Sequence, residues 1–126
     1  MRALGAELGR SWKAGDVVLL DGPLGAGKTT LVRGLLESLG VKEPVRSPTY
    51  NLLQGFDTDP PVLHADLYRV KSEAGIGIED YLETHLCLIE WPDRAPGLVR
   101  PDEAWHVKIE FVPEGRAVTI VPPAAQ

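Results

Sequence analysis

A run of eight residues, Gly22-Pro23-Leu24-Gly25-Ala26-Gly27-Lys28-Thr29, has the residue types and spacing that bind phosphate groups. It matches the pattern of a glycine, any four residues, a glycine, a lysine and a serine or threonine. The glycines allow a tight turn whose backbone N–H groups point at a phosphate chain, and a helix that begins at the lysine adds its positive end. The pattern therefore predicts a nucleoside triphosphate site in which Lys28 contacts the β- and γ-phosphates and Thr29 binds Mg²⁺.

The segments on both sides of this loop are those that a phosphate-binding loop needs. Residues 16–21 form a short apolar run that is typical of a buried parallel strand. After the loop, leucines recur at helical spacing and a glycine provides the helix stop; these residues are Leu31, Leu35, Leu36, Leu39 and Gly40. Because strand, loop and helix stand in the required order, a chance match in a glycine-rich turn is the weaker interpretation.

Two carboxylates follow apolar runs at places where α/β sheets bind their ligands. Asp66 ends the run 62–66, and Glu90 ends the run 86–90. Ligands of open α/β sheets lie at the carboxyl ends of the strands, and Mg²⁺ prefers oxygen ligands that include one or two carboxylates. Either acid could hold the metal, directly or through water, and Glu90 could also orient or deprotonate an attacking water. The alternative is that both acids simply face solvent.

The remaining polar residues give weaker signals. Ser47 and Thr49 lie in a proline-bracketed loop and could sense a γ-phosphate, although a rigid turn is the simpler interpretation. His64 alternates with Asp66 and could share its face, but a packed or solvent-facing histidine is the more common role. Three arginines could contact phosphate or a partner, although surface ion pairs are more common; they are Arg46, Arg69 and Arg94.

Length and hydrophobic patterning predict one α/β domain over residues 1–126. We expect a P-loop NTPase-like mixed β-sheet flanked by helices, with a C-terminal antiparallel hairpin. Val107, Ile109 and Phe111 alternate with polar residues, so one face of that hairpin is predicted to be buried. The other expected elements are an antiparallel pair, residues 50–56 with 62–66, and short helices over residues 3–12 and 79–83.

The charge and the cysteine content exclude some classes of protein. A net charge of −5 argues against strong independent nucleic-acid binding, which usually requires a basic face. Cys87 is the only cysteine, so no intrachain disulfide can form, and its apolar neighbours predict a small buried side chain. No apolar run is long enough for a membrane span or a signal peptide, so we expect a cytoplasmic protein without a membrane partner.

Several short blocks together resemble the TsaE family, once called YjeE, the small bacterial ATPase required for making threonylcarbamoyladenosine in tRNA. The resemblance covers nearly the whole chain, and the three blocks after the loop are not general features of phosphate-loop proteins. The family usually has an acidic residue where this chain has Pro23, which lacks an N–H donor. The blocks are Gly15-Asp16-Val17-Val18-Leu19-Leu20, Gly25-Ala26-Gly27-Lys28-Thr29-Thr30, Ser47-Pro48-Thr49-Tyr50, His64-Ala65-Asp66-Leu67-Tyr68-Arg69 and Ile89-Glu90-Trp91-Pro92-Asp93-Arg94.

The resemblance implies the ligands and the residues that bind them. ATP would be bound with Mg²⁺, with Glu90 and Lys28 as catalytic residues and Thr29, Asp66 and Glu90 serving the metal. Thr49 would belong to a switch-like loop, and Trp91 would lie near the nucleotide. The residues expected to contact ATP are Gly22, Leu24, Gly25, Ala26, Gly27, Lys28, Thr29, Thr30, Thr49 and Trp91.

The resemblance also implies partners, and it leaves two other functions to be weighed. The expected partner is a complex of TsaD, the threonylcarbamoyl transferase, with its companion TsaB, and tRNA would be reached only through that complex. A small-molecule kinase could use the same loop, but the chain has no arginine-rich insertion that could serve as a lid. A non-catalytic adaptor, in which ATP binding only orders a loop for a partner, uses the same residues and stays open.

Overall fold

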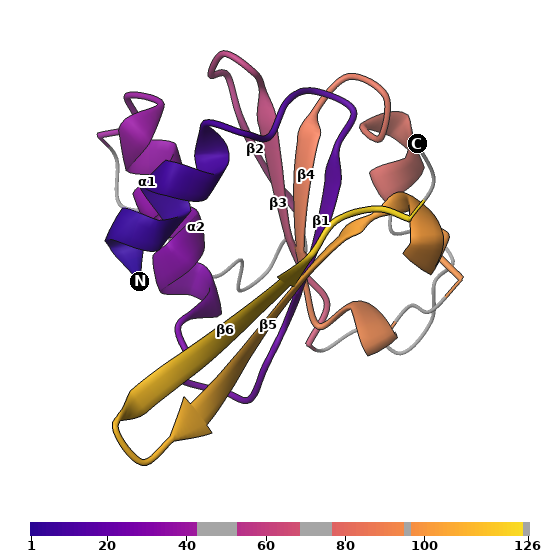
Figure 1. The fold of residues 1–126 in the computed structure, drawn as a ribbon. Helices are drawn as coiled ribbons and strands as arrows, with labels where there is room; N and C mark the ends of the chain where they lie inside the picture. Colours follow the sequence, from indigo (N-terminus) through magenta and orange to yellow (C-terminus); the bar gives the residue numbers. More distant parts are fainter. Residues whose placement is uncertain (43–52, 69–76, 95–96, 125–126) are drawn as a thin grey trace.

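The structure is a computed structural model that describes residues 1–42, 53–68, 77–94 and 97–124 (Figure 1). Its centre is a six-stranded sheet in the order β2-β3-β4-β1-β5-β6. The strands are β1 (Val17–Asp21), β2 (Leu53–Phe56), β3 (Val62–Asp66), β4 (Leu86–Glu90), β5 (Trp105–Val112) and β6 (Gly115–Val121). Strands β3, β4, β1 and β5 are parallel, and β2 and β6 are antiparallel edge strands. The predicted mixed sheet and C-terminal hairpin are therefore confirmed.

Both α-helices, α1 (Arg2–Gly9) and α2 (Lys28–Ser38), pack on the same face of the sheet (Figure 1). The residues of β1 alternate between the two faces of the sheet. Val18 and Leu20 pack in the hydrophobic cluster that contains the leucines of α2. Val17 and Leu19 point to the other face, which is covered by irregular segments and short 3₁₀ turns. Neither described helix has the length and hydropathy required to cross a membrane.

Three details differ from the sequence predictions. The first helix, α1, ends at Gly9 and not at Trp12. Residues 79–83 do not form an α-helix; Ile78–Asp80 is a single 3₁₀ turn, a form that proteins use for short connections. Phe111 was expected to be buried with Val107 and Ile109, but 55% of its surface is exposed. The reason is that β5 pairs with β1 only as far as Lys108, so the end of the hairpin has no further strand beside it and extends from the body (Figure 1).

The two helices cross where glycines bring their backbones together. A Cβ atom at Gly34 would lie 2.0 Å from the carbonyl oxygen of Arg2. We expect Gly34→Ala to lower the free energy of unfolding by about 2 kcal/mol, because the clash outweighs the roughly 1 kcal/mol that alanine gains in a helix. Urea denaturation measures the change. Gly55→Ala is the matched control, since a Cβ there meets no atom within 4 Å, and equal stability of the two variants would contradict the prediction.

Candidate phosphate-binding site

The phosphate-binding loop connects β1 to α2 at the carboxyl edge of the sheet. Gly25 and Gly27 have φ angles of 78° and 113°, a left-handed conformation that glycine adopts without a Cβ penalty. The helix begins at Lys28, as predicted, and no side chain caps its first turn. The N–H groups of a helix start are available to an anion when no side chain accepts their hydrogen bonds. The loop therefore has the backbone form that the sequence pattern predicts.

Lys28 is held in place although it carries a charge and is only 4% exposed. Its Nζ atom donates a 2.6 Å hydrogen bond to the carbonyl oxygen of Gly22, and it lies 3.5 Å from the centroid of the Trp91 ring. Burial lowers the pKa of Lys28, whereas the carboxylates of Glu90 and Asp66 act in the opposite direction. The lysine is thus an oriented cation at the base of the loop, surrounded by acids and an aromatic face.

Glu90 is the centre of the polar cluster, and the protein covers all but 3% of its surface. The Thr29 hydroxyl donates to its carboxylate at 3.0 Å from Oε2 and 3.3 Å from Oε1. His64, which is fully buried, places Nε2 only 2.6 Å from the same Oε2 atom. The alternative in which Glu90 faces solvent at the strand end is therefore wrong for this residue. A buried carboxylate needs such partners, because an uncompensated charge in the interior is costly.

His64 is the site residue that sequence analysis undervalued. The histidine was expected to be packed or exposed, and it is packed, but against the carboxylate of Glu90. Its Nδ1 atom is buried without a hydrogen-bond partner among the described residues. The signal available in the sequence was that His64 alternates with Asp66 and so shares its face of the strand. In the structure His64 lies opposite Leu88 of β4, two residues before Glu90. Only the pairing of β3 with β4 turns that alternation into a contact.

Asp66 ends β3 directly beside the end of β4, in register with Glu90. It is half-buried, and its Oδ1 atom accepts the backbone N–H of Tyr68. Among the described residues, no group of three or more His, Cys, Asp or Glu side chains is arranged to hold a metal. Mg²⁺ does not require one, since it usually takes one or two carboxylates and leaves its other positions to water and phosphate. The hydroxyl of Thr29 and the carboxylates of Glu90 and Asp66 are the hard oxygen donors that fit this ion.

Trp91 follows Glu90 and covers the lysine. Its φ angle of 58° makes it the one described non-glycine residue in the left-handed region, and such backbone strain occurs most often at functional sites. The ring also packs on Tyr68, with centroids 4.8 Å apart, and the Arg94 guanidinium lies 5.8 Å from it. Arg94 was expected to form a surface ion pair; its described contacts are instead with the Tyr68 and Trp91 rings.

The other predicted residues are distributed around this cluster. Leu24 is 63% exposed at the loop, whereas Ala26 is buried beneath it. Thr30 lies in the first turn of α2. Thr49, Ser47, Arg46 and Arg69 lie outside the described residues. Cys87 is buried as predicted, and burial raises the pKa of its thiol to about 12, so it stays protonated and is not a nucleophile near neutral pH.

The chain is similar to one family of known proteins over most of its length. The model of the family "Threonylcarbamoyl adenosine biosynthesis protein TsaE" matches residues 1–118. The TsaE protein of Haemophilus influenzae is 37% identical over 110 residues, covering 83% of this chain and 69% of the relative. The Nostoc TsaE protein is 38% identical over 128 residues, covering 94% and 78%. The crystal structure of Bacillus subtilis YdiB superposes with a TM-score of 0.81 at 29% identity, covering 97% of this chain and 78% of that one.

Proposed function

Because this chain belongs to the TsaE family of threonylcarbamoyl adenosine biosynthesis proteins, we propose that it is a Mg²⁺-dependent ATPase of that tRNA modification pathway. The observation that carries the proposal is the contact of Thr29 with Glu90 beside the buried Lys28. A loop that only bound phosphate would not need a buried carboxylate at its metal-binding hydroxyl. A nucleotide hydrolase needs one to hold the metal or to orient water.

Each residue of the cluster has a defined part in this proposal. Lys28 exchanges its hydrogen bond with Gly22 for the β- and γ-phosphates, and Trp91 leaves the lysine or stacks beside the bound nucleotide. Thr29 and Asp66 would hold Mg²⁺, which would supply positive charge beside the phosphates. Glu90 orients the attacking water or holds the metal through water. Because Glu90 is buried and already hydrogen-bonded, its carboxylate is oriented before the substrate arrives.

His64 acts in this proposal as a positioning residue for Glu90. We expect His64→Leu to lower kcat by about 10-fold to 100-fold with little change in the nucleotide Kd, because the carboxylate loses one of its two described partners. His64→Gln keeps a donor near the Nε2 position and should recover part of the loss. Steady-state kinetics with a fluorescence measurement of nucleotide affinity checks both. If the role of His64 is purely structural, the loss of kcat in each variant should follow its loss of stability, and His64→Gln should show no specific recovery.

The proposed partner is a complex of a TsaD-type threonylcarbamoyl transferase with a TsaB-type companion, for which ATP turnover would permit repeated cycles. The net charge of −5 supports a protein partner, with tRNA reached through the complex. The testing experiment measures ATP hydrolysis by the purified chain with Mg²⁺, with and without that complex and tRNA. We expect slow hydrolysis alone and stimulation by the complex. If the complex neither binds the chain nor changes its rate of ATP hydrolysis, the proposed partner is rejected.

A further inference from the structure

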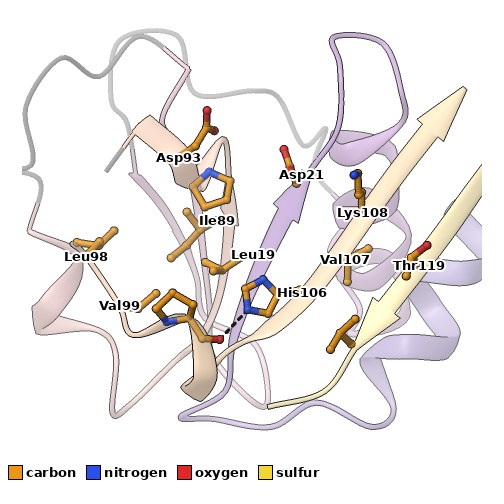
Figure 2. A pocket seen from close by; sticks show the side chains of 13 residues that line it. Leu19, Asp21, Ile89, Asp93, Leu98, Val99, His106, Val107, Lys108 and Thr119 are labelled. Atoms are coloured by element: carbon orange, nitrogen blue, oxygen red, sulfur yellow. Dashed lines mark hydrogen bonds between the residues drawn. The ribbon is translucent and has the colours of Figure 1, made fainter. Parts of the chain in front are cut away.

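A cavity of about 380 Å³ lies on the sheet face opposite the helices (Figure 2). Its apolar lining comes from four strands and from the segment after β4, and it includes Leu19, Ile89, Leu98, Val99, Val107 and Val121. Figure 2 shows these side chains around one space, with Asp21, Asp93, Lys108 and Thr119 around it. Cavities of this size with an apolar interior and a few polar groups are typical of binding sites. The proposed ATPase mechanism uses none of these side chains.

The cavity adjoins an edge of the sheet that is suited to pairing with another strand. In the part of the chain that the structure describes, β6 pairs with β5 on one side and with no strand on the other. Its residues 117–121, Ala-Val-Thr-Ile-Val, contain no charge and no proline, the two features that usually protect an edge strand. Thr119 and Val121 of this strand line the cavity, and Val121 is 50% exposed. A segment added to β6 would therefore pass along the cavity.

The charges around the cavity favour a basic occupant. Asp21 and Asp93 contribute two carboxylates to the lining and Lys108 contributes one ammonium group, and both carboxylates also interact electrostatically with Lys28. None of the three forms an ion pair within the described segments. The cavity therefore accepts an apolar side chain in its interior and a lysine or arginine at its acidic side, where the two charges would be complementary.

Strand β6 is also connected to the phosphate-binding loop, through the face that it turns away from the cavity. Arg116, near the start of β6, donates a 3.2 Å hydrogen bond to the carbonyl oxygen of Gly25 in the loop, and its guanidinium lies over the Phe111 ring. Asp21 lines the cavity and directly precedes the loop, and Asp93 lies two residues after Trp91. A segment bound in the cavity would thus lie between β6, which contacts the loop through Arg116, and the segment after β4, which contains Trp91 over Lys28.

We propose that the free edge of β6 and this cavity together dock an extended segment of a partner protein. The segment adds a strand to β6, inserts an apolar side chain into the cavity and places a basic side chain at Asp21 and Asp93. A second copy of this chain fits less well, because the one basic side chain of its β6, Arg116, already contacts Gly25. The inference rests on the proposed function, since it gives the partner complex a place to bind next to the nucleotide.

The test compares Val121→Lys, which places a charge at the edge and the cavity, with the matched control Val112→Lys. Val112 is also exposed, but it lies at the far end of β5 and does not line the cavity. With the TsaB–TsaD-type complex as the probe, we expect Val121→Lys to weaken binding by about 10-fold or more and the control to bind normally. Hydrogen exchange should show new protection, in the complex, of the backbone amides of β6 that point away from β5.

The outcomes separate this inference from the proposed function. If the complex binds and stimulates the chain while these outward-pointing amides stay unprotected and Val121→Lys binds normally, the docking surface is wrong and the proposed function stands. If the unaltered chain does not bind the complex, the partner assignment is wrong and the docking inference is rejected with it. If the chain alone forms a dimer that Val121→Lys dissociates, as measured by analytical ultracentrifugation, the edge belongs to a second copy and the inference is overturned.

Discussion

Glu90→Gln should lower ATP turnover by about 100-fold or more while the nucleotide Kd stays within about threefold of the unaltered value. Glutamine has nearly the same shape and can still accept hydrogen bonds from Thr29 and His64, so the fold of the site should persist. It has no negative charge with which to hold the metal or polarise water. Phosphate release measured at saturating ATP and Mg²⁺, beside a separate nucleotide titration, gives the two quantities.

Glu7→Gln is the control for this experiment, because Glu7 is exposed on α1, away from the phosphate-binding loop and the Glu90 cluster. A Glu90→Gln variant that hydrolyses ATP at the normal rate would remove Glu90 from the mechanism. The same variant separates the ATPase from a nucleotide-gated adaptor. If hydrolysis is lost while the partner complex binds and modifies tRNA over many cycles, the adaptor is the correct function.

Lys28→Ala is expected to have the largest effect on binding, with a nucleotide affinity lower by about 100-fold or more. The substitution removes the buried cation that is oriented by Gly22 and Trp91, and it leaves the nearby carboxylates of Glu90 and Asp66 to repel phosphate. Isothermal titration with ATP and Mg²⁺ measures the loss. Intrinsic tryptophan fluorescence provides a second readout, because Trp91 contacts Lys28 directly.

Lys13→Ala is the matched control, since the Lys13 side chain is exposed and only its backbone has described hydrogen bonds, both to Asp16. It should bind nucleotide normally. Lys28→Ala must also remain folded for the comparison to hold, which urea denaturation checks. Normal ATP affinity in a folded Lys28→Ala protein would show that the loop is not the phosphate site.

The local features of the site could be predicted from the sequence because each depends on short-range chemistry. The spacing of Gly22, Gly27 and Lys28 determines a loop that opens a helix, and the structure begins α2 at Lys28. The apolar runs that end in Asp66 and Glu90 predicted parallel strands, and the two acids end neighbouring strands in register. The family resemblance rested on the same blocks and is confirmed by a family match over residues 1–118.

Only the tertiary structure decided which of these groups touch. His64 and Glu90 are 26 residues apart in sequence, and their contact exists because β3 lies beside β4 in one register. The position of Trp91 over Lys28 depends on a left-handed backbone that no local pattern predicts for tryptophan. The exposure of Phe111 likewise follows from where β1 ends beside β5, and the free edge of β6 follows from its place at the end of the strand order. Sequence periodicity describes one strand at a time, whereas burial and contact depend on the neighbours that the sheet brings to each residue.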